Sequence, residues 1–527
     1  MRKPLIFLGT ASVAMSIFMV AGCKKNDKID NYTDGKLEVS IRNLYFNDYT
    51  GGDRYLEEIE DKFKLSFKLS AYDWANWETQ VIGQVNGGET PDVFHANIDS
   101  YNFANLYKFW AEEEVIKPLP TDLTKWPNIK KLIDNTSNVE SLKIDGKLYG
   151  LPIAKNTTDY STTFSPFTYI YRRDWAKKYG VYKENDEYTW SEFKHLMDVF
   201  EENLNPSGKS ALADVEWGYP SIVNFYKQVP HCFAQDLKTG KYVNNYTTDA
   251  YIEGLEESKS FVSNNYYYAS QYSARDGDMN IRYYSNQVGV FFENLSYANY
   301  FDIKEHLKQT NASVTNFNVD DAAAIMKIKG PDGKYALEGT DNWFSMSFFD
   351  YRISDEKQTK ILDLLDWLLS EEGTNFSVYG FEGYDYVKEG DTITLNEEYW
   401  PKNIDGTYAR KNNGGKYLRN IVSLGYDTLK YDPLTDKTSV NYLESWEAEM
   451  KEAENNGDLR VLKENAEVMW LTTPQKSNFS GSLRTDALNN VKKYIHNKDL
   501  HTIQDFKNTF SSKWTDVLNE INTALGK

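Results

Sequence analysis

Two things are scarce in this sequence: cysteine, and apolar runs long enough to cross a membrane. The only cysteines among the 527 residues are Cys23 and Cys232, so a disulfide framework does not hold the fold together. The apolar run from Leu5 to Val20 has 16 residues, fewer than the roughly 20 that a spanning helix needs. With 31 Gly and 14 Pro, the composition is that of an ordinary globular protein and excludes fibrous, disordered and multi-spanning classes.

Basic residues are also fewer than acidic ones. The chain has 59 Lys and Arg against 78 Asp and Glu, a net charge of −19. A protein with this negative charge repels phosphate backbones, so nucleic acid is not expected as a partner. Aromatic residues, in contrast, make up 15% of the chain, which is more than a core of Leu, Ile and Val requires and indicates aromatic surfaces for stacking.

The first 22 residues have the pattern of a secretion signal. Arg2 and Lys3 precede the apolar run, and Val20-Ala21-Gly22-Cys23 resembles the lipobox of bacterial lipoproteins. Residues 1–22 would be removed, and Cys23 would become the first residue and carry the lipid. Cleavage removes two basic residues and no acidic one, which takes the net charge from −19 to −21. We therefore expect an extracytoplasmic protein that is held to the cell membrane by an N-terminal lipid.

Residues 23–36 contain almost no apolar side chains, so the lipidated Cys23 and a flexible tether are expected to precede the folded body. Cys232 is the one thiol that remains. Its neighbour His231 would be the partner of a cysteine nucleophile, but adjacent residues point apart on a strand and rarely meet on a helix. We expect Cys232 to be a small buried residue.

The common catalytic motifs are missing. The sequence contains no HExxH, GxSxG, GxxxxGK[ST], GxGxxG or CxxC, so no enzyme activity, metal or other cofactor is expected. Glycosidases escape this test because their two carboxylates lie far apart in sequence and form no short motif. A lipid-anchored glycoside hydrolase therefore stays open as an alternative, as does a surface adhesion lipoprotein without catalysis.

Hydrophobic periodicity predicts an α/β fold. Apolar and polar residues alternate from Leu37 to Tyr45 and again from Leu65 to Ala71, as in half-buried strands, and between them Leu56, Ile59 and Phe63 share one helical face. Strand, helix and strand in this order predict a parallel β-α-β unit with its functional loops at the carboxyl ends of the strands. Three further helices are predicted, over residues 77–85, 101–113 and 354–372.

Several phrases together resemble the extracellular solute-binding proteins of bacterial ABC transporters, in the carbohydrate-binding branch that includes maltose-binding and alginate-oligosaccharide-binding proteins. Besides the lipobox, they are Gly87-Gly88-Glu89-Thr90-Pro91-Asp92-Val93, Asp145-Gly146-Lys147-Leu148-Tyr149-Gly150-Leu151-Pro152, Tyr171-Arg172-Arg173-Asp174-Trp175 and Gly380-Phe381-Glu382-Gly383-Tyr384-Asp385-Tyr386. Asp145-Gly146 is in addition a hairpin turn on local grounds alone.

The resemblance implies a two-lobe periplasmic-binding-protein-like fold with a ligand cleft between lobes that are joined by a hinge. We expect lobe 1 over residues 37–165 and 310–350, and lobe 2 over 166–309 and 351–527. The implied function is that of the substrate-binding lipoprotein of an ABC importer, a monomer that captures a carbohydrate, expected to be an oligosaccharide, by lobe closure. Its implied partners are the carbohydrate and the permease subunits to which the protein delivers this carbohydrate.

Candidate ligand-binding residues follow strand ends or stand where the family lines its cleft. Asn97 and Asp99 follow a predicted strand, where amide and carboxylate groups bind sugar hydroxyls, and an indole of Trp74 or Trp77 stacks on the apolar face of a pyranose. A solvated loop and a place in the core are the alternative readings of these residues. The resemblance adds seven positions, namely Trp217, Tyr219, Asn294, Tyr297, Trp343, Glu382 and Tyr384.

The sequence departs from the pattern of the family at one loop. Relatives with acidic ligands often carry a calcium loop after the first helix of lobe 2, but residues 203–210 offer no carboxylate and include Lys209, so we expect no calcium there. The acidic body favours neutral sugars over uronates as ligands, although Lys155, Arg172, Arg173 or Arg275 would allow a local positive patch. A basic or peptide ligand stays open as well.

Overall fold

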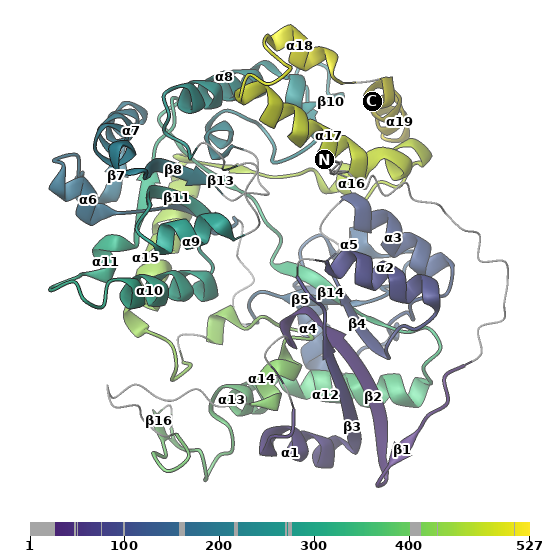
Figure 1. Cartoon of the computed structure of the whole chain (residues 1–527). Helices are drawn as coiled ribbons and strands as arrows, with labels where there is room; N and C mark the ends of the chain where they lie inside the picture. Colours follow the sequence, from purple (N-terminus) through teal and green to yellow (C-terminus); the bar gives the residue numbers. More distant parts are fainter. Residues whose placement is uncertain are drawn as a thin grey trace, which may run out of the picture.

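The computed structural model describes residues 27–46, 49, 51–74, 76–97, 101–157, 164–214, 220–268, 271, 277–390, 392–400, 413–428, 431–510 and 512–527. Within these ranges the chain forms two lobes, each built on its own β-sheet (Figure 1). Lobe 1 comprises residues 27–157 and 340–428, and lobe 2 comprises residues 164–339 and 431–527. None of the described helices combines the length and the apolar character that crossing a membrane requires.

Lobe 1 contains a six-stranded sheet in the order β1-β2-β4-β14-β5, with β3 paired to β2. Strands β2, β3 and β4 are mutually parallel, and β14 runs antiparallel to both β4 and β5. The strands are β1 (Tyr32–Thr33), β2 (Lys36–Asn43), β3 (Leu65–Ala71), β4 (Val93–Ala96), β5 (Leu151–Ala154) and β14 (Trp343–Phe349). The α/β class predicted from periodicity is confirmed.

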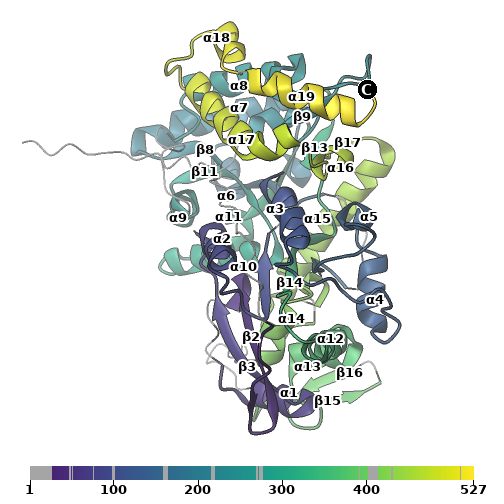
Figure 2. The ribbon, with the colours of Figure 1, turned by 90° about the vertical axis from the view of Figure 1, so that its right-hand side faces the viewer.

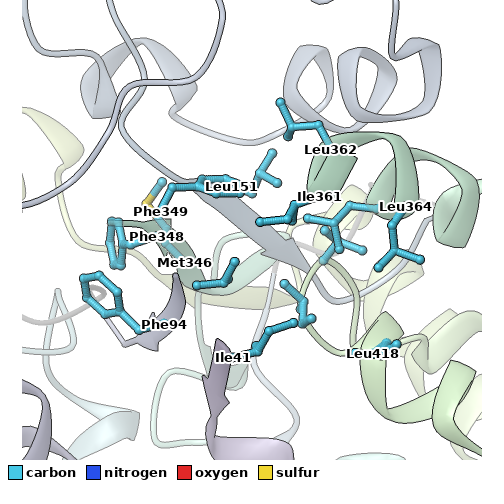
Figure 3. Close-up of a cluster of buried hydrophobic side chains, with 14 of the residues drawn as sticks. Ile41, Phe94, Leu151, Met346, Phe348, Phe349, Ile361, Leu362, Leu364 and Leu418 are labelled. Carbon is cyan, nitrogen blue, oxygen red and sulfur yellow. The ribbon is translucent and has the colours of Figure 1, made fainter. Parts of the chain in front are cut away.

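Helices cover both faces of this sheet. They are α1 (Arg54–Phe63), α2 (Trp77–Gly87), α3 (Tyr101–Glu112), α4 (Pro127–Asp134), α5 (Val139–Leu142), α12 (Asp355–Leu369), α13 (Glu371–Tyr379) and α14 (Gly414–Arg419), followed on the edge by the hairpin β15 (Tyr386–Glu389) and β16 (Thr392–Leu395). On one face Phe94 and Phe348 pack against Trp110 of α3, with ring centroids 5.9 and 5.8 Å from its indole. On the other, α12 and α14 contribute Ile361, Leu364 and Leu418 (Figure 3).

The lobe boundaries therefore differ from those expected. The amphipathic helix α12 and helices α13 and α14 pack on the first sheet, so residues 355–422 belong to lobe 1 and not to lobe 2. Strand β12 (Ala324–Ile328) pairs with β6 (Phe167–Tyr171) in the second sheet, so the chain returns to lobe 1 only after residue 339. Periodicity identifies a helix that needs a sheet to cover, but it does not say which of two sheets is covered.

Lobe 2 contains a five-stranded sheet in the order β7-β12-β6-β11-β8. Its other strands are β7 (Glu187–Tyr188), β8 (Ser210–Asp214) and β11 (Val288–Asn294). Its covering helices are α6 (Arg173–Lys178), α7 (Trp190–Leu204), α8 (Asp249–Ser263), α9 (Asp278–Tyr284), α10 (Tyr297–Thr310), α11 (Val319–Ala322) and α15 (Lys437–Asn456). Alternate residues of β6 serve two cores, because Ile170 packs with α10 and α15 while Tyr169 and Tyr171 pack with α7.

The last part of the chain adds a separate helical layer to lobe 2 (Figure 2). It consists of α16 (Ala466–Met469), α17 (Pro474–Ile495), α18 (Ile503–Asn508) and α19 (Ser512–Ala524), packed with α8 and the small sheet of β9 (Phe233–Gln235) and β10 (Tyr242–Asn244). Helix α17 also reaches lobe 1, where the Ser477 hydroxyl donates to the Asn105 carboxamide at 3.0 Å. The Lys108 ammonium donates to Thr472 at 3.1 Å.

Three connections join the lobes, and the described residues next to them lie side by side. The amide of Lys155 donates to the carbonyl of Asn342 (3.0 Å), and its carbonyl accepts from the amide of Tyr426 (3.0 Å). On the lobe 2 side, the amide of Gly339 donates to the carbonyl of Leu462 (2.6 Å) where β13 (Tyr335–Glu338) and β17 (Leu459–Leu462) pair in parallel. Because the crossings lie close together, bending at them allows one lobe to rotate against the other.

The segment expected to be a free tether is folded from Lys28 onward. The Lys28 ammonium donates to the carbonyl of Thr90 (2.6 Å) and lies 3.1 Å from Asp92 and 3.2 Å from Asp350. The Ser354 hydroxyl donates to Asp30 at 2.6 Å, and β1 pairs antiparallel with β2. The tether prediction is wrong for residues 28–36, because polar composition predicts solvation but takes no account of buried charges elsewhere in the chain that need partners.

The predictions of individual strands, helices and turns in lobe 1 agree with the structure. Burial alternates strictly along β2, and α1 contains the predicted face of Leu56, Ile59 and Phe63, with the Asp53 carboxylate accepting from two first-turn amides. Ser354 caps α12, with its hydroxyl accepting from the amide of Lys357 at 3.0 Å. Asp145 and Gly146 have φ of 47° and 74°, as the central residues of a type I′ turn require, which confirms the hairpin.

Candidate functional site

Three aromatic side chains gather at the carboxyl edge of the lobe 1 sheet, where β2 and β3 end and the antiparallel β14 begins. Trp74 follows β3 and keeps 43% of its surface exposed. Its ring lies edge-on to Tyr45, which follows β2, with centroids 5.6 Å apart, and 6.5 Å from Phe344 of β14. Together Tyr45, Trp74 and Phe344 form what we call the aromatic edge.

Two buried polar residues lie beneath the aromatic edge. Nδ1 of His95, on β4, lies 3.1 Å from the carboxamide oxygen of Asn43, which also accepts from the amide of Tyr45 at 2.9 Å. The His95 ring is 5.7 Å from that of Tyr45. Burial lowers the pKa of His95 to about 3, so the imidazole is neutral at physiological pH. Because Nδ1 donates to Asn43, Nε2 is an acceptor, and it has no partner within the described part of the chain.

Two residues predicted from the sequence border the same edge. Trp77 opens α2 and is half-buried against the lobe 1 core, and Asn97 follows β4 and is half-buried as well. Both residues therefore lie at the edge of the sheet where the parallel strands end and their loops begin, as expected from the β-α-β pattern. Asp99, which was named with Asn97, lies outside the described residues.

Lobe 2 contributes two predicted residues at the corresponding carboxyl end of β11. Asn294 ends that strand, and its carboxamide oxygen accepts from the amide of Ser296 at 2.9 Å, which starts α10. Tyr297 follows, with its ring 6.3 Å from Tyr426 in the connection that arrives from lobe 1. Trp217 and Tyr219, also expected here, lie outside the described residues.

Comparison with known proteins places the chain in a family. Residues 54–380 match the model of a family described as bacterial extracellular solute-binding protein, which covers more than half of the sequence. The chain belongs to the bacterial extracellular solute-binding proteins. The family resemblance drawn from the sequence is thereby confirmed, and the family is one of extracellular proteins. No curated protein matches the chain.

Solved structures of solute-binding proteins share the two-lobed α/β fold. The alginate-binding protein AlgQ2 without calcium ion superposes with a TM-score of 0.65 at 14% identity, covering 94% of this chain and 99% of its own. An HMO-binding ABC-transporter-associated solute-binding protein from Bifidobacterium longum infantis has a TM-score of 0.60 at 16% identity, covering 93% and 97%. FusA of S. pneumoniae, in complex with kestose, gives 0.60 at 12% identity, covering 93% and 99%.

Among the solute-binding protein's other predicted ligand residues, Trp343 lies in the interior. It is 3% exposed, its indole N–H donates to the carbonyl of Ser137 at 3.1 Å, and its ring is 6.2 Å from that of Trp470. Its neighbour Phe344 faces the opposite side of β14 and packs against Trp74. The sequence argument named the residue at this strand end whose side chain faces the interior, since a shift of one position reverses the direction of a strand side chain.

Glu382 and Tyr384 directly precede β15, and β16 and α1 lie at the opposite end of lobe 1 from α2 in both views (Figures 1 and 2). Tyr384 is 61% exposed, with its ring edge-on to Tyr399 at 6.5 Å. Glu382 lines a pocket of about 550 Å³ between α1, α12 and α13, a separate hollow lined by both charged and apolar side chains. In this conformation these two residues are not part of the aromatic edge.

Sequence reasoning missed Tyr45, Phe344, His95 and Asn43. Tyr45 continues the alternation of apolar and polar residues beyond the end of β2, and this pattern could have identified it from the sequence. His95 and Asn43 were hidden because their juxtaposition depends on the pairing of β2 with β4, which are 52 residues apart at this contact.

No group of three or more His, Cys, Asp or Glu among the described residues is arranged to hold a metal ion. In the loop for which no calcium was expected, Asn205 donates its amide to the Glu201 carboxylate at 2.9 Å and the Ser207 hydroxyl to the carbonyl of Leu204 at 2.7 Å. The absence of calcium stays a prediction.

Cys232 is expected to resist thiol reagents in the folded protein. Its side chain is 1% exposed, with Sγ 3.7 Å from the Tyr246 hydroxyl, and burial raises the pKa of the thiol to about 12. Treating the chain from residue 24 with a chromogenic disulfide reagent should give no reaction in buffer and one thiol per chain in guanidinium. Rapid reaction without denaturant would show that Cys232 is accessible and reopen the nucleophile reading.

Proposed function

We propose that this solute-binding protein captures a carbohydrate, in the form of an oligosaccharide, outside the cell and delivers it to the permease of an ABC importer. The observation that carries the proposal is the aromatic edge at the carboxyl end of the lobe 1 sheet. Its most exposed member, Trp74, presents an apolar ring surface in a protein family that binds solutes. Such a ring stacks on the C–H face of a pyranose at low entropic cost, and the carboxamide of Asn97, in the loop after β4 at the same edge of the sheet, can pair with hydroxyl groups.

The similar solved structures support this choice of ligand class. One of them is described as alginate-binding, one as HMO-binding, and one was solved with kestose bound. Sequence identities of 12 to 16% support a shared fold but do not identify a shared ligand, so the particular sugar is not inferred from any of these structures.

In this proposal the ligand lies between the lobes and closes them. The aromatic edge, Trp77 and Asn97 would contact it from lobe 1, and Asn294 and Tyr297 from lobe 2. Lys155 lies where the first connection meets the other two, so bending there moves one lobe against the other. A ligand that touches both lobes binds the closed state better and shifts the equilibrium toward it, and the permease would recognise that state.

The protein would act as a monomer without catalysing a reaction, held to the membrane by a lipid on Cys23. A neutral ligand is favoured, because the basic residues that would form a positive patch already have partners where they are described. Lys155 donates to Thr340 (2.5 Å) and to the carbonyl of Asp341 (2.8 Å), and Arg172 binds Asp174 at 2.5 and 2.8 Å. Arg173 pairs with Asp186 at 2.9 Å, and Arg275 lies outside the described residues.

Thermal unfolding of residues 24–527 against a panel of neutral, acidic and amino oligosaccharides and peptides tests the proposal. A ligand at 100 times its dissociation constant should add about 2.7 kcal/mol, a shift of a few degrees. We expect a shift with neutral oligosaccharides, unchanged sugar chain lengths after incubation, and a smaller radius of gyration at saturation. Shortened chains would indicate a glycoside hydrolase, and no shift with any sugar would contradict carbohydrate capture.

A further inference from the structure

The start of the described chain is fixed to lobe 1 by buried charges. The Lys28 ammonium lies between two carboxylates, 3.1 Å from Asp92, which is 5% exposed, and 3.2 Å from Asp350, which is 1% exposed. The amide of Lys28 also donates to the carbonyl of Arg352 at 3.0 Å. Removing this cation would leave Asp350 with Arg352 (2.6 Å) and Asp92 with Lys357 (3.5 Å) as their only charged partners among the described residues, so the Lys28 contacts stabilise the position of the segment.

A second set of contacts follows at once. Asp30 accepts from the Ser354 hydroxyl at 2.6 Å and lies 3.3 Å from the ammonium of Lys357, whose side chain is 4% exposed. The carbonyl of Asn31 accepts from the amide of Glu38 at 2.9 Å, and β1 then pairs with β2. We call residues 28–33, with these contacts, the clamp.

The clamp shortens the distance over which a lipid on Cys23 can hold the protein. Chain geometry allows at most about 3.6 Å per residue, so the five steps from Cys23 to Lys28 span no more than about 18 Å. A free tether up to β2, as composition predicted, would reach to Lys36 and span about 45 Å.

The clamp also lies at a defined side of lobe 1. Asp92 immediately precedes β4 and Asp350 immediately follows the antiparallel β14, so both stand at the same edge of the sheet. Trp74 and Asn97 follow the strands at the opposite edge. The eight residues of β2 run from one edge to the other, over about 23 Å.

We propose that the clamp holds lobe 1 against the bilayer, with the Asp92 and Asp350 edge within about 18 Å of the lipid surface and the aromatic edge at the opposite end of the sheet. The partner surface is the lipid bilayer in which the acyl chains of Cys23 are inserted. The inference rests on the proposed lipidation of Cys23. Lobe 2, which has no such attachment, is then the lobe that moves when ligand binds.

Energy transfer from the protein to the membrane tests the clamp independently of lipidation in the cell. The chain from Cys23 onward is coupled through that thiol to a synthetic diacyl maleimide lipid; Cys232 is buried and does not compete. A donor dye is attached to p-azidophenylalanine at position 89, an exposed residue next to Thr90, and the vesicles carry an acceptor on their headgroups. We expect strong transfer in the wild-type chain.

The variant Lys28→Ala/Asp30→Ala should release the clamp and lower this transfer by more than half, since the tether can then extend. Lys68→Ala/Asp61→Ala makes the same charge change with exposed residues of lobe 1 and should leave transfer unchanged. Equal transfer in wild type and the released variant, or weak transfer in wild type, would overturn the inference. Mass spectrometry of the cell-derived protein decides separately whether Cys23 is lipidated, so the two failures are distinguishable.

Discussion

Replacing Trp74 by alanine is expected to weaken carbohydrate binding by ten- to a hundredfold while the unfolding temperature stays nearly unchanged. The indole is 43% exposed and touches Tyr45 and Phe344 only at centroid distances of 5.6 and 6.5 Å, so the fold depends little on it. Burying its free face against a sugar ring is worth about 1.5–3 kcal/mol, and each 1.4 kcal/mol is a factor of ten in affinity. Calorimetric titration with the ligand found in the panel measures the loss.

Two further variants make this result specific. Trp74→Phe keeps a ring for stacking and should retain most of the affinity. Tyr384→Ala removes another exposed aromatic of lobe 1, 61% exposed but at the far end, and should leave affinity unchanged. If Tyr384→Ala weakens binding and Trp74→Ala does not, the ligand binds at the β15–β16 end and the aromatic edge is not the site.

The sequence specified the local structure of lobe 1 well because the controlling interactions are short-range. Alternation along β2, the Asp53 cap of α1 and the turn at Asp145 and Gly146 each depend on residues within a few positions of one another. The same holds for the position of Trp74 and Asn97, since a parallel β-α-β unit directs its loops to one edge.

What the sequence did not specify depends on pairing between distant segments. Helix α12 has a clear apolar face, but its contact with Ile41 and Met346 rather than with the second sheet follows from the return of β14 between β4 and β5. The clamp was missed for the same reason: a polar stretch predicts solvation unless buried carboxylates 64 and 322 residues further along need a cation. Phe344 was missed by a single position, because strand parity is not visible from the sequence near an irregular strand start.

Removing the carboxylate of Asp350 is expected to lower the free energy of unfolding of lobe 1 by about 3–5 kcal/mol. Asp350 is 1% exposed and accepts from Arg352 at 2.6 and 2.9 Å and from the Thr90 hydroxyl, while Lys28 lies 3.2 Å away. Asp350→Ala leaves these donors without an acceptor, whereas Asp350→Asn keeps the shape and should cost less. Asp355→Asn, whose ion pair with Lys117 involves a side chain 95% exposed, should change stability by no more than about 0.5 kcal/mol.

The cost of Asp350→Asn should also depend on pH. Burial by itself raises the pKa of Asp350, but the hydrogen bonds from Arg352 and the charge of Lys28 outweigh it and hold the pKa below its usual value. A carboxyl with a lowered pKa contributes its full stabilisation above its unfolded pKa, about 3.9, and loses it as the pH falls through the folded value. Urea unfolding should therefore separate wild type from Asp350→Asn most at neutral pH and less below about pH 4. A difference that grows on acidification would mean that Asp350 is not held as an anion by Lys28 and Arg352.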